Sequence, residues 1–220
     1  MIQDQPISFL DTETTGIGPL HRIVEIGLVQ VIDRTIIESL NFQVYLNPDR
    51  AVDESAYAVH GLSDDFLSNQ PRFESIESDL INRIQGTDLY IHNAAFDVAF
   101  LDREWARLGL KTRVESIAQV KDTLAMARVL YPGQKNSLDA LCKRFGIDSS
   151  HRTLHGALLD AQLLAQVYLA MTSGQEELYF QTAQSTYQSS QHDCYIHRVQ
   201  ISDEDQAKHL EMMAQLEQSN

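Results

Sequence analysis

Apolar and polar positions in the first fifty residues predict three strands. A short apolar run over residues 7–10 ends at Asp11 and predicts a buried strand with an acidic end. Residues 22–33 alternate with a period of two, and residues 35–46 continue the pattern after a tight connection. That connection favours an antiparallel hairpin, and Pro48 ends the third segment.

Beyond residue 50, segments with a helical period alternate with two short apolar runs. The runs, at residues 88–91 and around 116–120, are expected to form parallel strands. Three leading antiparallel strands followed by two parallel ones predict an α/β fold, a mixed β-sheet flanked by helices. The helices are expected at 53–68 in short pieces, 73–84, 93–108, 122–130, 137–145 and 156–171.

The composition changes near Gly174. Residues 181–191 are polar, with few charges and few aliphatic side chains, as is typical of a linker. A short strand at 195–201 and a helix beginning after Ser202 are expected beyond it, in a segment too small to bury a core of its own. We therefore expect a folded domain over 1–174 and a flexible linker with a docking tail over 181–220.

Charge and composition narrow the class of protein. The chain carries 31 acidic and 17 basic residues, for a formal net charge of −14. Alone, this balance disfavours nucleic-acid binding, because phosphate-binding surfaces carry excess Lys and Arg. Carboxylates that bind divalent cations reverse the local charge, so the placement of the acidic residues matters more than their number. Two cysteines, no long apolar run and no signal-like start predict a soluble, cytoplasmic protein without a membrane partner.

Asp11 and Glu13 form the first candidate site. On an extended strand, residues i and i+2 face the same side about 7 Å apart, so both carboxylates enter one space. There they repel each other unless a cation lies between them or one holds a proton. For the pair taken alone, an exposed polar strand end is the usual explanation.

Three further residues follow strand ends or helix starts. Asp97 lies in the first turns of the helix after the strand 88–91, at the sheet edge where α/β folds bind ligands, although an acid there can simply complement the helix dipole. His155 precedes Gly156 and a helix in which Asp160 is surrounded by Leu and Ala, and a buried acid needs a partner. A capping histidine beside an unrelated exposed acid is the alternative. Carboxylate ligands without cysteine favour Mg²⁺ or Mn²⁺ over Zn²⁺.

These segments resemble the three motifs of the DnaQ-like 3′–5′ exonucleases that carry four acids and a histidine. The motifs occur in the family's order at suitable separations, and further segments resemble the branch formed by the proofreading (epsilon) subunits of bacterial DNA polymerase III. The resemblance covers about residues 6–174 and implies a ribonuclease H-like fold. The motifs are 11–16, 92–97 and 155–161, and the further segments are 44–50, 59–61 and 136–142.

The resemblance also implies roles for individual residues. Asp11, Glu13 and Asp160 would bind two divalent metal ions, and Asp97 would complete the site directly or through water. His155 would be the general base for the attacking water. Thr12, His60 and the three metal ligands would contact the 3′-terminal nucleotide. The chain departs from the family at Ser55, where relatives carry an acid that touches the substrate.

The implied activity is 3′–5′ exodeoxyribonuclease proofreading on a single-stranded or frayed 3′ DNA end. Alternatives are an exoribonuclease of the same superfamily that trims RNA 3′ ends, and a non-catalytic linker between clamp and polymerase. The implied partners are the polymerase catalytic (alpha) subunit, reached through the acidic C-terminal tail, and a small accessory (theta-like) subunit.

Residues 175–180 carry a separate signal. Gln175, Leu178 and Phe180 resemble the short peptides with which bacterial replication proteins bind the sliding clamp, a polar anchor followed by an apolar pair. Two alternatives remain open. The preceding helix can simply continue through Phe180, or residues 176–181 can be a remnant of a tobacco etch virus protease site.

Overall fold

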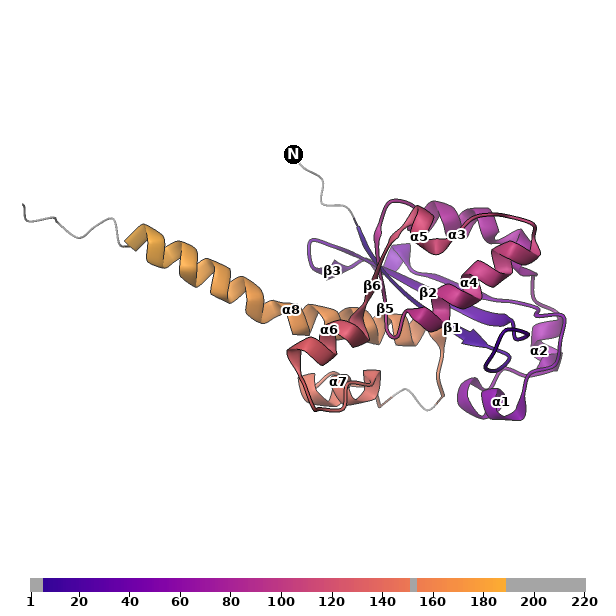
Figure 1. The fold of residues 1–220 in the computed structure, drawn as a ribbon. Coiled ribbons are helices and arrows are strands. Elements are labelled where there is room, and N and C mark those ends of the chain that lie inside the picture. The colour runs from indigo at the N-terminus through magenta and orange to yellow at the C-terminus, as the bar shows by residue number, and fades with distance from the viewer. Residues whose placement is uncertain (1–5, 151–153, 189–220) are drawn as a thin grey trace, which may run out of the picture. The chain divides into compact units, whose positions relative to one another are not determined.

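A mixed sheet forms the centre of the fold in the computed structural model, which describes residues 6–150 and 154–188. Strand β1 (Ile7–Thr14) pairs antiparallel with β2 (Ile23–Ile32) and parallel with β5 (Asp88–Ile91). Strand β6 (Gln119–Asp122) pairs parallel with β5, and β3 (Thr35–Ile36) and β4 (Phe42–Tyr45) both pair antiparallel with β2. The predicted arrangement, antiparallel strands first and parallel strands after, is confirmed (Figure 1).

Helices cover both faces of this sheet, because successive strand residues point to opposite sides. Phe9 belongs to a core shared with residues of α6, α7 and α8, whereas Leu10 belongs to a core on the other face, shared with residues of α3, α4 and α5 (Figure 1). The helices are α1 (Glu54–His60), α2 (Asp64–Ser68), α3 (Glu77–Ile84), α4 (Ala95–Arg107), α5 (Val114–Ile117), α6 (Thr123–Leu130), α7 (Leu138–Phe145) and α8 (Ala157–Gln188), with short 3₁₀ turns η1 (Glu38–Leu40) and η2 (Phe73–Ser75).

The predicted third strand, 35–46, is broken into β3 and β4. Its two pieces pair with opposite ends of β2: Ile36 lies opposite Val31, and Phe42 lies opposite Leu28. The pairing register differs between the two pieces, and the intervening chain leaves the sheet as the turn η1. An alternating pattern cannot reveal such a change of register, since both pieces keep the period of two.

The strand expected around 116–120 begins later, at Gln119. Ser116 lies in the short helix α5, where its hydroxyl donates to the carbonyl of Arg113 and accepts from the same residue's backbone N–H. Serine competes well for nearby backbone groups, which favours a capped turn over a strand at this position.

The last core helix, expected over 156–171, continues to Gln188 as α8. A single glycine, Gly174, is followed by Gln, Glu, Leu and Ala, which favour helix, and no proline stops it. The helix therefore includes the backbone of 175–180 and of the first residues expected in the linker. The chain divides into two units, 1–176 and 177–220, and the tail predicted beyond residue 188 lies outside the described residues. Among the helices that the structure describes, none is long and apolar enough to cross a bilayer.

A buried ion pair joins α4 to the start of β2. Glu104 is only 2% exposed, and Nε and one terminal NH₂ of Arg22 each donate to a different Glu104 oxygen over 2.7 Å. Arg107 adds a third donor at 3.2 Å. This fork-to-fork geometry holds α4 against the beginning of β2.

Removing one partner of such a pair leaves the other charge buried and unpaired. We expect Glu104→Ala to lower the free energy of unfolding by about 3–5 kcal/mol. Urea unfolding followed by the fluorescence of Trp105, the only tryptophan in the chain and fully buried, measures it directly. A loss below about 1 kcal/mol would place the pair among ordinary surface ion pairs instead.

Candidate active site

The end of β1 places both of its acids on one face of the sheet and Thr12 on the other. Asp11 and Glu13 lie opposite Gly27 and Glu25 of β2, on the face that α8 covers. Thr12 points to the other face, toward α4. The pairing between β1 and β2 shifts between Glu13 and Thr14, a bulge of the kind that redirects side chains beside active sites.

Asp97 approaches from α4, where it lies in the first turn of the helix that follows β5. Its side chain is 3% exposed, and the hydroxyl of Thr12 donates a 2.7 Å hydrogen bond to its Oδ1. Burial, the largest cause, raises the pKa of the Asp97 carboxyl to about 7, although the hydrogen bond from Thr12 opposes this change. The acid is thus a buried part of the site, as expected for a ligand-binding group and not for a solvated helix end.

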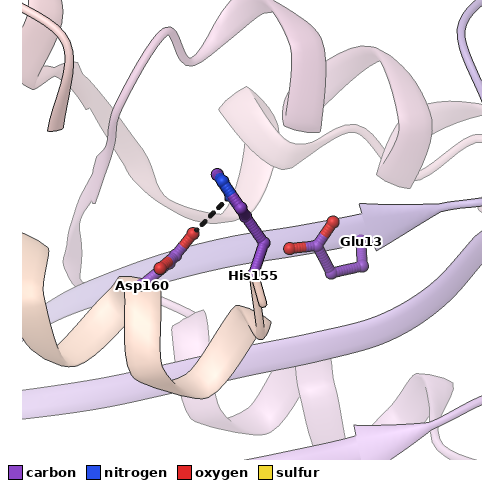
Figure 2. A group of neighbouring side chains, drawn as sticks. All are labelled: Glu13, His155 and Asp160. Carbon is purple, nitrogen blue, oxygen red and sulfur yellow. Dashed lines mark ion pairs between the residues drawn. The ribbon is translucent and has the colours of Figure 1, made fainter. Parts of the chain in front are cut away.

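His155 and Asp160 lie together at the start of α8. Nδ1 of His155 is 3.3 Å from Oδ2 of Asp160, which is 4% exposed and belongs to the helix's first turn (Figure 2). One ligand atom each from Glu13, His155 and Asp160 lie within 4.8 Å of one another. The prediction that His155 precedes the helix while Asp160 turns inward agrees with this geometry.

The two acids of β1, Asp97, His155 and Asp160 were predicted to carry the chemistry. All five side chains line one cleft of about 200 Å³. It lies at the carboxyl ends of β1 and β5, the edge where α/β sheets bind ligands. The lining residues are Asp11, Thr12, Glu13, His92, Asn93, Phe96, Asp97, Leu138, His155 and Asp160.

A second, more apolar pocket of about 320 Å³ shares Glu13 with the cleft and contains His60. Nδ1 of His60 accepts from the backbone N–H of Leu62, so the neutral ring donates from Nε2 to the carbonyl of Thr14, 3.2 Å away. Burial lowers the pKa of His60, which favours that neutral form. The pocket is lined by Glu13, Thr14, Gly16, Ile17, Ser55, Ala56, Val59 and His60.

Relatives with known names resemble this chain over most of its length. The family model described as "Exonuclease" matches residues 8–168. The DNA polymerase III subunit epsilon of Pasteurella multocida is 51% identical over 176 residues, covering 77% of this chain and 69% of that protein. The subunit of the same name from Escherichia coli is 49% identical over 186 residues, covering 81% and 76%.

The chain belongs to the exonuclease family of DNA polymerase III epsilon subunits. The resemblance stated from the motifs is therefore confirmed. Among solved structures, the nuclease domain of 3′hExo, a DEDDh family member bound to rAMP, superposes with a TM-score of 0.66 at 20% identity and covers 77% of this chain and 92% of that one. That likeness confirms the ribonuclease H-like fold.

The epsilon-family cleft fits divalent cations. Its donors are mainly carboxylates, three of them largely buried, and no lysine or arginine is among its lining residues. Oxygen donors of this kind suit hard cations, and bound cations offset the repulsion among the acids. The family is metal-dependent, and the donor set agrees with that requirement.

One acid was not assigned a role from the sequence. Glu25 of β2 is 1% exposed, and the backbone N–H groups of Ala157 and Leu158 and the amide of Gln43 donate to its carboxylate. Burial raises its pKa, and these hydrogen bonds oppose the rise. An acid inside an otherwise apolar strand is the sequence signal that could have pointed to Glu25. The sequence pattern does not show which helix begins next to that acid in the fold.

The raised pKa of Asp97 predicts how stability depends on pH in the metal-free epsilon-family chain. An acid whose pKa is higher in the folded state stabilises the fold below its ordinary pKa of 3.8, and this contribution is lost as the pH rises toward 7. We expect Asp97→Asn to be more stable than the parent at pH 8 in EDTA, with the difference shrinking toward pH 4. Thermal unfolding across this range measures it, and parallel curves for the two proteins would contradict the assignment.

Proposed function

We propose that the cleft hydrolyses the 3′-terminal phosphodiester of a DNA strand and releases nucleoside monophosphates, proofreading synthesis as the epsilon subunit of a bacterial DNA polymerase III. The exonuclease activity belongs to the family, and the specific roles below are proposed. The observation that carries them is that β1, the start of α4 and the start of α8 meet at one cleft, where ligand atoms of Glu13, His155 and Asp160 lie within 4.8 Å of one another.

Asp11, Glu13 and Asp160 are proposed to hold two divalent cations, Mg²⁺ or Mn²⁺, with Asp97 completing the site. Bound cations supply charge stabilisation at the attacking and leaving oxygens of a phosphodiester. The protein fixes the ligands: Glu13 and Asp11 on a sheet strand, Asp160 in the first turn of α8, and Asp97 against Thr12. Asp11, Thr12, Glu13 and Asp160 are also proposed to contact the 3′-terminal nucleotide.

His155 is proposed as the general base that takes a proton from the attacking water. Imidazole titrates near neutral pH, so it can accept this proton and release it after the reaction. Its side chain is 43% exposed, unlike that of Asp160, and Gly156 follows it in the chain. A base at the rim of the cleft can meet both the incoming water and the solvent that receives the proton.

The second pocket is proposed to take the nucleoside of the 3′-terminal residue. It adjoins the cleft at Glu13, and its walls are mainly apolar. His60 holds the carbonyl of Thr14, and its ring offers the pocket a buried wall beside Val59. His60 is thus proposed to contact the nucleotide, as expected from the sequence. It would do so with its ring, because both ring nitrogens bind the protein backbone.

Digestion of a 3′-labelled primer tests the proposal. The chain is expected to release mononucleotides from a mismatched 3′ end faster than from a paired one, with Mg²⁺ or Mn²⁺ but not with EDTA, and Asp11→Ala is expected to abolish the release. A matched RNA primer separates the exoribonuclease alternative, which predicts equal or faster RNA digestion. Failure of the parent chain to digest either polymer would leave only the non-catalytic linker function.

The partners of the chain are also proposals. The tail over 175–220 carries eight acidic and two basic residues, a composition suited to a protein partner and not to DNA. We propose that it tethers the exonuclease to the polymerase catalytic (alpha) subunit in the cytoplasm and that an accessory theta-like subunit binds the domain. Tethering near the primer end lets an acidic exonuclease act with little DNA affinity of its own.

The clamp-binding assignment of Gln175, Leu178 and Phe180 rests on the sequence motif alone. Deleting residues 175–180 is expected to abolish retention of the sliding clamp in a pull-down, because a polar anchor and an apolar pair are lost together. Exonuclease activity on a primer is expected to stay at the parent level, since the cleft residues end at Asp160. Unchanged clamp retention would show that residues 175–180 serve only as part of helix α8 and not as a clamp-binding motif.

A further inference from the structure

Helix α8 begins directly after a residue without a side chain. The residue before Ala157 is Gly156, so the free N–H groups of the first turn must find acceptors elsewhere. Glu25 of β2 supplies them, because its carboxylate accepts from the backbone N–H groups of Ala157 and Leu158. A negative charge at a helix N-terminus also complements the helix dipole.

The first turn of α8 is pressed closely onto β2 beside this contact. A Cβ atom on Gly27 would lie 2.2 Å from the carbonyl carbon of Ala157 and from the nitrogen of Leu158, so only glycine allows the approach. Gly27 and Glu25 share the strand face that α8 covers. Together they form a socket, defined by these two residues, that receives the start of the helix.

The same turn carries two side chains of the cleft. Asp160 donates its backbone N–H to the carbonyl of Gly156 over 2.9 Å, and His155 immediately precedes that glycine. A shift of the turn on β2 would therefore move both side chains away from Glu13 of the neighbouring strand. Figure 2 shows how close the three lie in the observed position.

We propose that Glu25 is a positioning residue of the exonuclease: its carboxylate holds the first turn of α8 in the socket and thereby fixes Asp160 and His155 in the cleft. The inference rests on the function proposed above. Glu25 acts through the helix and not as a ligand, since its oxygens accept from Gln43 at 2.8 Å and from the helix amides.

Glu25→Gln is the test variant, because it keeps the size of the side chain while removing the charge and one acceptor oxygen. Mn²⁺ affinity is measured without nucleic acid, by electron paramagnetic resonance titration of the full chain, and kcat and KM are measured on a 3′-labelled primer. Outer residues that orient ligands typically contribute about 10- to 100-fold to metal affinity or activity. We expect losses of that size in Mn²⁺ affinity and kcat, with KM nearly unchanged.

Glu104→Gln is the matched control, since Glu104 is a second buried acid that lies on α4 and outside the cleft. It is expected to lower thermal stability while leaving Mn²⁺ affinity at the parent value. Gln43→Ala, at an exposed position, removes the side-chain donor to Glu25 together with its hydrogen bond to the hydroxyl of Tyr45. It is expected to weaken Mn²⁺ binding by a smaller factor than Glu25→Gln does.

Two results would overturn the inference. One is parent-like Mn²⁺ affinity and kcat in Glu25→Gln; the other is an equal loss in Glu25→Gln and Glu104→Gln, which would make Glu25 merely structural. The proposed function fails separately, when the parent chain binds Mn²⁺ but digests no primer.

Discussion

Asp160→Asn is expected to reduce hydrolysis of a 3′-labelled DNA primer by about a thousandfold or more, because a metal-ion site supplies several kcal/mol of transition-state stabilisation. Asparagine keeps the shape of the side chain but loses the charge that would hold a cation beside Glu13. Single-turnover digestion at saturating Mg²⁺ measures the loss. Mn²⁺ titration of the same variant is expected to show weakened binding.

The stability of this variant should change in the opposite direction from its activity. Two buried carboxylates near each other repel in the absence of a cation, so metal-free Asp160→Asn is expected to be at least as stable as the parent. Asp79→Asn, an exposed position on α3 paired with Arg83, makes the same chemical change outside the cleft and serves as the control. Comparable activity in the two variants would remove Asp160 from the site.

His155→Ala is expected to lower kcat by about 100- to 10,000-fold, the usual contribution of a general base. KM and Mn²⁺ affinity should change little, since the carboxylates stay in place. Added imidazole should restore part of the variant's rate, because it supplies the missing base.

Leu154→Ala is the control for this substitution. Leu154 is half-exposed in the same segment and lies near Gly61, so its loss tests the packing of the segment without touching its chemistry. It should keep the parent's kcat, and added imidazole should not change its rate. A His155→Ala enzyme that retains near-parent hydrolysis with Mg²⁺ present would show that another group accepts the proton.

The sequence predicted the strands and the candidate acids because both follow from short-range signals. Residues 88–91 were predicted to form a strand, and β5 spans the same residues, since an apolar run bounded by turns is unambiguous. The shared orientation of Asp11 and Glu13 follows from the period of two in a strand. Asp160 was a candidate because it is an acid among apolar neighbours. The order of the three motifs then placed Asp97 and His155 with them.

What the sequence could not show depends on contacts between distant segments. The break between β3 and β4 reflects a change of register against β2, which no local pattern records. Glu25 is an acid in an apolar strand, yet its role appears only when the start of α8 lies over it. His60 was expected to contact substrate, and only the structure shows that its nitrogens bind the backbone of Thr14 and Leu62.

Locating the ions themselves tests the central claim most directly. Anomalous diffraction at the manganese edge, from crystals grown with Mn²⁺ and a nucleoside monophosphate, is expected to show two peaks about 4 Å apart. Both should lie in the cleft, with Asp11, Glu13 and Asp160 as their protein ligands. Ions bound elsewhere, or a cleft whose peaks are beyond reach of Glu13 and Asp160, would contradict the account.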